Sequence, residues 1–370
     1  MSAVVALVVI FAGAYVAYQL FLSPLSRIPG PFWAKLSYFG MLLGALGNDA
    51  HRDFLSLHKK YGKVVRIGPN SLSVTDPAAF REIYKAGGER DEKVHGEQRK
   101  LVARAYSMES MIHLEPRVDE TLTTLLQKFD ELQGQTIDLA QWLQLFAFDI
   151  IGAISFSRPY GYVEAGDDNG IFALLKTTFK SLAWLTRALW FFRLHQRLKS
   201  FFGDFISLGA SNRNGYFHQF AWKEINARKA REGDDRDMLG KLLTVQQSKP
   251  QMNDTNIAFM MTSNVTAGSD TTSFGLSAIF HYLLNNPDKY RCLVEELEKQ
   301  KANERYFFTF GGGSRTCIGR NISWLEMEKL VPTLLMRYNF QLAPDAKLVD
   351  DCGFLMFARG LYVNWTLRDI

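Results

Sequence analysis

The sequence contains little cysteine, with only three in 370 residues. Cys292, Cys317 and Cys352 form no Cys-x-x-Cys pair, and their odd number cannot be fully paired. This pattern argues against a disulfide framework and against a zinc ribbon. Reduced thiols on the cytosolic side of a membrane fit the pattern best.

The chain also lacks a strong excess of charge of either sign. Its 43 Lys and Arg residues against 38 Asp and Glu residues give a net charge of +5, and the basic residues are evenly spread. We therefore expect no nucleic-acid partner. Hydrophobic residues make up 47% of the chain, including 28 Phe, which excludes a disordered or collagen-like protein and allows a large core.

Formal charge is absent from residues 3–22, which read AVVALVVIFAGAYVAYQLFL. Twenty helical residues span ~30 Å, the hydrocarbon thickness of a bilayer. A cleaved signal peptide would need basic residues before the apolar run, and none is present; a buried helix is the third alternative. We expect residues 1–22 to form a single-pass anchor. Arg27 and Lys35 follow the run, which places the rest of the chain in the cytosol.

Proline is concentrated just after this run, in the sequence SPLSRIPGPF. Proline fixes φ and removes a backbone donor. Residues 23–36 are therefore predicted to form a stiff, extended tether that orients a cytosolic domain, with an ordinary loop as the alternative.

The rest of the chain is predicted to be mainly α with a small β part, and not a doubly wound sheet. Strands at 64–68 and 71–74 flank Gly68-Pro69-Asn70, which indicates a hairpin. Further short strands are expected at 339–342, 354–357 and 361–365. Helices are predicted at 51–61, 76–85, 93–106, 110–132, 138–156, 168–198, 203–230, 235–247, 254–284, 288–301 and 318–337.

The most specific segment is a glycine-rich loop, FGGGSRTCIGR, at residues 310–320. The glycines at 311–313 permit positive φ and close approach of the backbone to a flat partner. Gly319 would let the chain pass close to whatever group the neighbouring sulfur holds.

Cys317 lies in this loop at the start of a predicted helix. There the helix dipole and free N–H groups stabilise a thiolate over a thiol. Arg315, two residues earlier, provides a permanent cation that suits a carboxylate. A lone thiolate beside a cation, in a loop that can approach a flat group, predicts a ligand or nucleophile.

Several other cysteine and glycine loops fail on spacing. A phosphate loop ends in Gly-Lys-Ser/Thr, which is absent. A phosphatase-like loop would have Arg six residues after Cys317, where Ser323 stands. A redox pair would need cysteine at Arg320. A buried structural cysteine remains as the alternative.

The segment from Phe310 to Gly319 resembles the haem-binding signature of cytochromes P450, FxxGxRxCxG, at every fixed position. The resemblance implies a P450-like fold and haem (iron protoporphyrin IX) with Cys317 as the axial thiolate ligand. It also implies that Arg315 pairs with a haem propionate and that Phe310 packs beside the ligand loop. Gly311, Gly313 and Gly319 would shape that loop.

A second motif, Ala-Gly-Ser-Asp-Thr-Thr at 267–272, lies inside the long helix predicted over 254–284. Glycine costs a helix about 1 kcal/mol relative to alanine, so another role is expected. Ala267 and Gly268 would open a groove where a ligand touches the backbone, while Asp270 and Thr271 suit a proton relay. The alternative is a loosely packed helix with a solvated Asp. The motif is similar to the oxygen-activating helix of the same family, which implies that Thr271 and Asp270 handle dioxygen and its protons.

A weaker match is His95-Gly-Glu-Gln-Arg99, whose spacing puts His95 and Arg99 on one helical face. By the resemblance both would reach haem propionates. A solvated charged face is the alternative.

The resemblance extends over nearly the whole chain and is closest to fungal, pisatin-demethylase-like P450s. It implies a haem domain at 37–370 behind the anchor in the endoplasmic reticulum membrane. The partners it implies are membrane lipid, an NADPH-cytochrome P450 reductase, O2 and a small apolar organic substrate, with secondary metabolism as the setting.

The chain departs from the family in one region. No Glu is followed by Arg three residues later, although P450s have such a pair before the haem loop. The predicted fold is therefore incomplete, with residues missing near 300–303 and a second gap suspected at 86–91. A faulty or alternative splice model and a real but degenerate protein are the two explanations.

We expect a monooxygenase that inserts one oxygen atom of O2 into its substrate. The alternatives are an inactive remnant that binds haem weakly or not at all, and a haem-thiolate isomerase or dehydratase.

Overall fold

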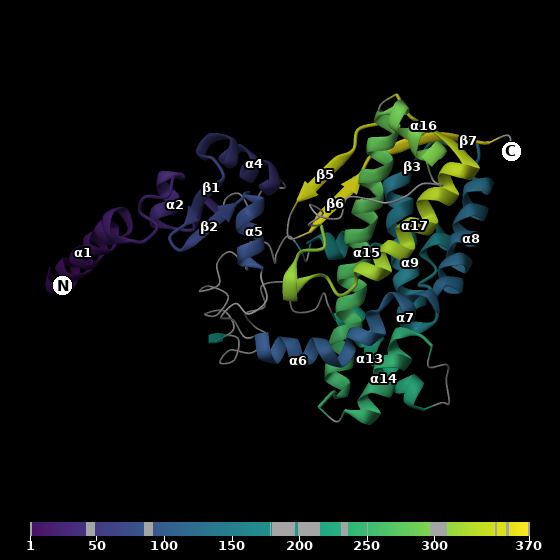
Figure 1. The fold of residues 1–370 in the computed structure, drawn as a ribbon, viewed down its shortest axis with the longest axis horizontal. Helices are drawn as coiled ribbons and strands as arrows, with labels where there is room; N and C mark the ends of the chain where they lie inside the picture. The colour runs from purple at the N-terminus through teal and green to yellow at the C-terminus, as the bar shows by residue number, and fades with distance from the viewer. Residues whose placement is uncertain are drawn as a thin grey trace. The chain divides into compact units, whose positions relative to one another are not determined.

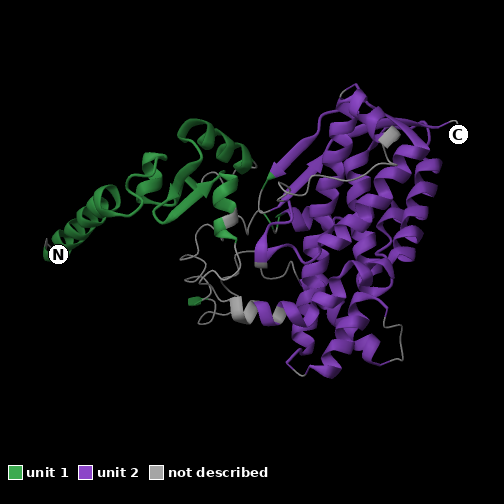
Figure 2. Ribbon diagram, viewed as in Figure 1, with its two compact units in different colours: residues 1–85, 177–210, 352–354 green, residues 86–176, 211–351, 355–370 purple. Residues whose placement is uncertain are grey.

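The computed structural model describes residues 2–41, 49–84, 92–177, 179, 197–198, 215–230, 236–249, 251–296, 309–344, 346–352 and 355–368. It divides the chain into two compact units (Figure 2). Unit 1 contains residues 1–85, 177–210 and 352–354; unit 2 contains residues 86–176, 211–351 and 355–370. The division into an anchor (1–22), a tether (23–36) and a haem domain (37–370) stays a prediction.

Unit 1 combines the apolar N-terminus with a small helical and β part (Figure 1). Its elements are α1 (Ser2–Ala17), η1 (Tyr18–Leu22), α2 (Phe32–Leu36), α4 (Ala50–Tyr61), β1 (Val64–Gly68), β2 (Ser71–Val74) and α5 (Pro77–Ile83). The predicted hairpin is confirmed, since β1 and β2 pair antiparallel with Val64 opposite Val74. Asp76 caps α5 by accepting a 3.0 Å hydrogen bond from the Ala78 N–H, which satisfies one of the free donors at the helix start.

The N-terminal apolar run is helical and exposed, as expected for an anchor. Residues Ala3–Leu22 have a mean hydropathy of 2.2, and only 6% of the run is buried. Within the described residues one other helix is long and apolar enough to span a membrane, Leu139–Phe156, but 83% of it is buried. That second helix belongs to the protein core.

The predicted extended tether is wrong in its conformation. Residues 23–28 form turns, in which the Ser26 N–H donates to the Ser23 carbonyl and the Ile28 N–H to the Leu25 carbonyl. The short helix α2 then follows Pro31. Each proline restricts its own φ and the conformation of the residue before it. These restrictions are compatible with the observed turns, so the prolines did not keep the segment extended.

Unit 2 is mainly helical. Its helices are α6 (Glu92–Val102), η2 (Ala103–Tyr106), α7 (Met108–Ile112), α8 (Glu115–Glu131), α9 (Leu139–Phe156), α10 (Tyr162–Ala165), α13 (Gly215–Lys229), α14 (Met238–Ser248), α15 (Asp254–Asn285), α16 (Pro287–Glu296), η5 (Gly313–Arg315) and α17 (Arg320–Arg337). The mainly α prediction with a small β part is confirmed.

The core of unit 2 forms around α9 and α15, which pack along each other (Figure 1). Nearly every residue of α9 is buried, which explains its almost uninterrupted apolar sequence. The helices α8 and α17 pack against this pair and against each other. The long helix α15 also packs against α13, β6 and α17, so it runs through the middle of unit 2.

Two small sheets complete the described chain. One has the order β3 (Ile137–Asp138), β7 (Tyr362–Leu367) and β4 (Tyr338–Leu342), with antiparallel pairing. The other contains β5 (Val349–Cys352) and β6 (Met356–Arg359). The sequence did not predict β3 or β5, because a strand of two to four residues carries almost no periodicity.

The helix predicted over 110–132 is in fact two helices. α7 ends at Ile112 and α8 begins at Glu115, with Pro116 in the first turn of α8. Proline is favoured there because its missing N–H would have no helical partner. The helix predicted at 168–198 lies largely outside the described residues. The helix predicted at 203–230 is confirmed in its described part, where it is α13 (Gly215–Lys229). The suspected gaps at 86–91 and 300–303 also lie outside them.

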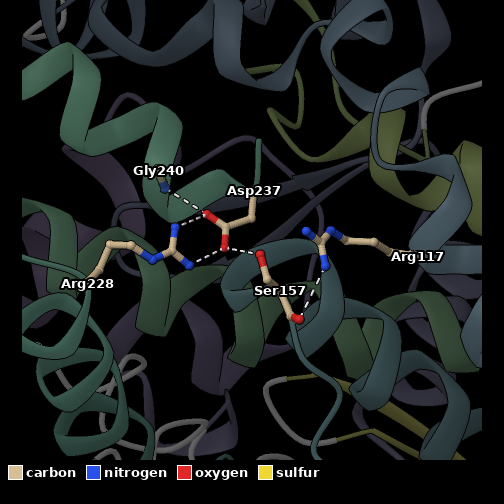
Figure 3. A network of polar contacts seen from close by, with 5 residues as sticks. All are labelled: Arg117, Ser157, Arg228, Asp237 and Gly240. Carbon is tan, nitrogen blue, oxygen red and sulfur yellow. Dashed lines mark hydrogen bonds and ion pairs between the residues drawn. The ribbon is translucent and has the colours of Figure 1, made fainter. Parts of the chain in front are cut away.

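A buried ion pair holds α13 to α14 (Figure 3). Arg228 donates to both carboxylate oxygens of Asp237, at 3.0 and 2.6 Å, and the Gly240 N–H donates to Oδ1 at 2.8 Å. The Ser157 hydroxyl at the end of α9 bonds to Oδ2, and Arg117 of α8 donates to the Ser157 carbonyl. The carboxylate charge is thus compensated in the core, as a buried charge requires.

Candidate functional site

The glycine-rich loop folds back on itself before α17. The Cys317 N–H donates to the Phe310 carbonyl at 2.8 Å, which closes the loop. Gly311 and Gly313 have φ of 74° and 57°, so the predicted need for positive φ is confirmed at these two positions. The Phe310 ring lies 6.1 Å from the Trp324 ring of α17, and this contact holds the loop against the helix.

Cys317 is exposed and lies three residues before α17. A Cβ atom built on Gly319 would lie 3.9 Å from the Cys317 sulfur. A larger side chain at this position would fill the space beside the sulfur. Glycine therefore leaves that space open for a group bound to the sulfur.

The loop borders a cavity of unit 2 with a volume of about 1080 Å³. This cavity is lined by parts of α6, η2, α15 and the loop, and it brings together Arg99, Arg315 and Cys317. Arg99 lies more than 200 positions before Arg315 and Cys317 in the sequence, yet all three line the same cavity.

Arg99 of α6 braces the ligand loop directly. Its Nη1 donates to the Thr316 carbonyl at 2.6 Å, so the guanidinium is held next to Cys317. Its other nitrogens remain available to a carboxylate in the cavity. His95 belongs to the same helix, but its side chain lies outside the described residues, and its role stays a prediction.

Two cavity residues were not singled out from the sequence, Tyr106 and Asn264. The Tyr106 hydroxyl donates to Asn264 Oδ1 at 2.7 Å, and Asn321 of α17 donates to the Tyr106 carbonyl at 2.8 Å. Burial raises the pKa of Tyr106 to about 12, and the nearby Cys317 charge contributes to this rise. The pair joins α15 to the segment behind the loop, and no local sequence pattern marks such a long-range bond.

Ala267 and Thr271 continue the face of α15 that lines the cavity. Met260 and Asn264 line it, and steps of three and four residues from them lead to Ala267 and Thr271. Both are exposed. The Thr271 hydroxyl donates to the Ala267 carbonyl at 2.6 Å, so its oxygen retains lone pairs for a bound group.

Gly268 and Asp270 lie on the other side of α15, against α9. A Cβ atom on Gly268 would lie 3.2 Å from Ile151 Cδ1. The structure thus gives Gly268 a packing contact between the two helices, and the expected ligand groove at Ala267 and Gly268 stays a prediction. Small residues allow helix backbones to approach closely at such a contact.

Asp270 is buried, with 1% of its surface exposed. Gln144 of α9 donates to Asp270 Oδ1 at 2.8 Å, while Oδ2 has no partner among the described residues. Burial raises the pKa of Asp270 to about 7, and the Gln144 hydrogen bond opposes this rise. The carboxyl can therefore hold or release a proton near neutral pH. The alternative of a solvated Asp is excluded, because the side chain is buried.

Glu326 of α17 is a second buried acid that the sequence did not reveal. Both carboxyl oxygens are buried and lack a partner among the described residues. Burial raises the pKa of Glu326 well above its usual value. Glu326 lies in α17, the helix that follows the ligand loop. Loss of its proton at high pH would therefore leave a buried charge without a partner and destabilise this helix.

Replacing Glu326 by Gln is expected to remove a fall in stability with rising pH. The folded chain keeps the proton on Glu326 above pH ~4.5, where the unfolded chain releases it, so stability falls by about 1.4 kcal/mol per pH unit until the raised pKa is reached. Thermal unfolding midpoints from pH 5 to 8 test this. Glu328→Gln, on the same helix, is the control. Equal pH slopes for E326Q and the unaltered chain would contradict the prediction.

The residues of this site fit a haem with a thiolate ligand. The described residues contain no cluster of three or more His, Cys, Asp or Glu side chains that could hold a bare metal ion. A single exposed sulfur is instead open on the Gly319 side, and two guanidinium groups line the same cavity. One thiolate for iron and cations for carboxylates are the donors such a group needs.

Comparison with known proteins gives a consistent result. The profile of one family, Cytochrome P450, matches residues 89–302 and 296–364. The cytochrome P450 monooxygenase hepC of Aspergillus oryzae is 46% identical over 332 residues, covering 80% of this chain and 65% of hepC. AsR2 of Sarocladium schorii, also a cytochrome P450 monooxygenase, is 32% identical, covering 76% of this chain and 62% of asR2. The chain thus spans just under two thirds of the length of these relatives.

A solved structure shows the same fold. The cytochrome P450DA heme domain superposes with a TM-score of 0.71 at 14% identity, covering 92% of this chain and 98% of that chain. This likeness concerns the fold alone.

The comparisons also support missing internal residues. The alignment with a cytochrome P450 monooxygenase of Aspergillus terreus, 27% identical, extends over 456 positions, more than the 370 residues of this chain. It covers 85% of this chain and 90% of the relative. The relative therefore contains residues that this chain lacks. The family profile matches in two pieces that meet at 296–302, where the sequence predicted one of the gaps.

Proposed function

Since the chain belongs to the cytochrome P450 family, we propose that it is a haem-thiolate monooxygenase acting on an apolar organic substrate in secondary metabolism. The observation that carries this proposal is the exposed Cys317 sulfur at the wall of a cavity of about 1080 Å³, inside a complete ligand motif. Haem, when bound, supplies dioxygen activation, with the thiolate favouring cleavage of the O–O bond.

Cys317 would hold the iron, and Arg315 and Arg99 would hold the propionates, with His95 as a further candidate. Arg99 is already fixed by its bond to Thr316, so it loses little side-chain entropy when it binds a carboxylate. Phe310, through its carbonyl and its ring, keeps the loop in place. Gly311 and Gly313 allow the turn.

Asp270 and Thr271 would deliver protons. Asp270 can carry a proton at neutral pH because of its burial. Thr271 is exposed, on the face of α15 that continues from the cavity-lining residues, and its hydroxyl donates to the Ala267 carbonyl. The two side chains point to different sides of the helix. A water or a rotation of one side chain would link them, and Ala267 leaves room for either because it is small.

The substrate would be mainly apolar. The cavity wall includes the side chains of Leu101, Val102, Phe259, Met260 and Ile318. Polar residues such as Gln251, Asn256 and Ser263 line other parts of the wall. Apolar side chains combined with placed polar groups are typical of pockets for small organic molecules. Electrons would come from an NADPH-cytochrome P450 reductase, with α1 as the anchor in the endoplasmic reticulum membrane.

Incorporation of labelled oxygen tests the proposal. The full chain in lipid nanodiscs, with reductase, NADPH and ¹⁸O2, is incubated with a library of small apolar carbocyclic compounds. Products that carry one ¹⁸O atom support a monooxygenase. Products without label in the same assay indicate an isomerase or dehydratase, and a folded chain without haem indicates an inactive remnant.

Gln144→Leu is expected to shift the pH dependence of product formation upward by about one unit. The Gln144 amide donates a hydrogen bond to the Asp270 carboxylate. Such a bond stabilises the charged form by ~1.5 kcal/mol, which corresponds to about one pKa unit. Without it the carboxyl keeps its proton to higher pH, and a step that uses that proton persists to higher pH. The measurement is the ratio of product to NADPH consumed from pH 6 to 9.

Gln141→Leu, two residues past the start of the same helix and exposed, is the control for Gln144→Leu. It should leave the pH midpoint unchanged. A purely structural effect of Gln144 would lower the ratio at every pH without moving its midpoint.

A further inference from the structure

The end of the predicted membrane anchor is built into the folded part of unit 1. Gln19, the strongly polar residue of the apolar run, is buried. Arg66 of β1 donates to Gln19 Oε1 at 2.6 Å and to the Gln19 carbonyl at 3.2 Å. The same guanidinium donates to the Pro69 carbonyl at 2.7 Å. Arg66 is fully buried, so this clamp is a rigid joint between the anchor and the hairpin.

The segment after the anchor is held against the same joint. The Arg66 N–H donates to the Pro29 carbonyl at 2.8 Å. A Cβ atom on Gly30 would lie 2.2 Å from the Arg66 carbonyl oxygen, so only glycine fits this approach. Lys35 of α2 donates to the Ser26 carbonyl at 3.1 Å. The segment is therefore folded onto β1 and cannot extend away from the anchor.

A hydrogen bond places α2 alongside the anchor helix. The Tyr15 hydroxyl donates to the Leu36 carbonyl at 3.0 Å. Tyr15 lies seven residues before Leu22, the end of the apolar run, which corresponds to about 10 Å along a helix. The end of α2 is thus level with a point inside the run, and not beyond it.

The aromatic side chains of this region are exposed. Phe32, Trp33 and Phe39 have 56%, 69% and 61% of their surface accessible, and the Phe32 and Trp33 rings contact each other. Large exposed aromatic side chains such as the Phe32–Trp33 pair are unfavourable in water. Tryptophan beside a spanning helix is favoured at the boundary between headgroups and acyl chains.

We propose that Phe32, Trp33 and Phe39 lie in the interfacial layer of the bilayer, held there by the joint of Arg66 with Gln19. The partner of this surface is the lipid next to the anchor. The inference rests on the proposed anchoring by α1 and is independent of the haem chemistry. It makes the anchor a rigid part of unit 1 and excludes a free tether.

Quenching of Trp33 by brominated lipid tests the inference. The full chain is reconstituted in phosphatidylcholine vesicles that carry bromine near the headgroup end or near the methyl end of the acyl chains. The chain has seven Trp residues, so the Trp33 signal is the difference between the unaltered chain and Trp33→Phe. We expect loss of most of this signal with shallow bromine and a smaller loss with deep bromine. Quenching by aqueous acrylamide with no effect of bromine would overturn the inference.

Two further measurements distinguish a failure of the anchor proposal from a failure of the interfacial placement of the aromatic residues. Alkaline extraction of the vesicles shows whether α1 anchors the chain: release would mean that the anchor proposal fails, and with it the inference. Retention without bromine quenching means that only the inference fails. The double variant Gln19→Leu with Arg66→Leu removes both sides of the joint. It is expected to weaken the shallow quenching while the chain stays in the membrane, and unchanged quenching would contradict a role for the joint.

Discussion

Replacing Cys317 by alanine is expected to abolish the absorbance of thiolate-ligated haem completely. The sulfur is exposed at the wall of the cavity, and Gly319 leaves the space beside it open. Without the sulfur the loop would offer the iron no thiolate, because residues 310–320 contain no other cysteine. The measurement is the reduced, CO-bound difference spectrum, together with haem content per chain.

The chain offers a matched control in its other exposed cysteine. Cys292 lies on α16 and outside the cavity wall. Cys292→Ala should leave the spectrum unchanged. Cys317→Ser, which keeps the size of the side chain, should lose the thiolate band as Cys317→Ala does. A band that survives in both Cys317 variants would show that the iron is held elsewhere.

Replacing Asp270 by Asn is expected to lower the rate of product formation by about 100-fold, in the range of a lost general acid. Asn keeps the shape and can still bond to Gln144, but it cannot exchange a proton. In the unaltered chain the rate should fall as pH rises through about 7, where the buried carboxyl loses its proton. The variant should lack this limb of the pH profile.

Ser277→Ala is the control for Asp270→Asn. Ser277 is buried in the same helix and donates to the Ser273 carbonyl, so its loss tests disruption of α15 without touching the acid. Rates within twofold of the unaltered chain are expected. NADPH consumption that continues in Asp270→Asn without product would identify proton delivery as the lost step.

Much of the local structure followed from the sequence because its causes are local. The hairpin at Gly68-Pro69-Asn70 and the start of α5 at Asp76-Pro77 depend on adjacent residues. The ligand loop likewise depends on Gly311 and Gly313, whose positive φ is observed.

Other features depend on partners far away in the chain and had no sequence signal. Gln144 meets Asp270 across 126 positions, and Tyr106 meets Asn264 across 158. Whether an acid on a helix faces water or a neighbouring helix is decided by packing, which turned Asp270 toward α9. Packing also decided the course of the proline-rich segment, which lies against β1 because the Arg66 N–H donates to the Pro29 carbonyl.

The central claim is that this chain holds haem through Cys317 although it lacks the Glu-x-x-Arg pair. The most direct test is the reduced, CO-bound difference spectrum of the unaltered full chain purified in lipid nanodiscs, with its folding checked by circular dichroism. We expect a thiolate-type band with about one haem per chain. A folded helical chain that shows no haem, or haem without the thiolate band, would contradict it.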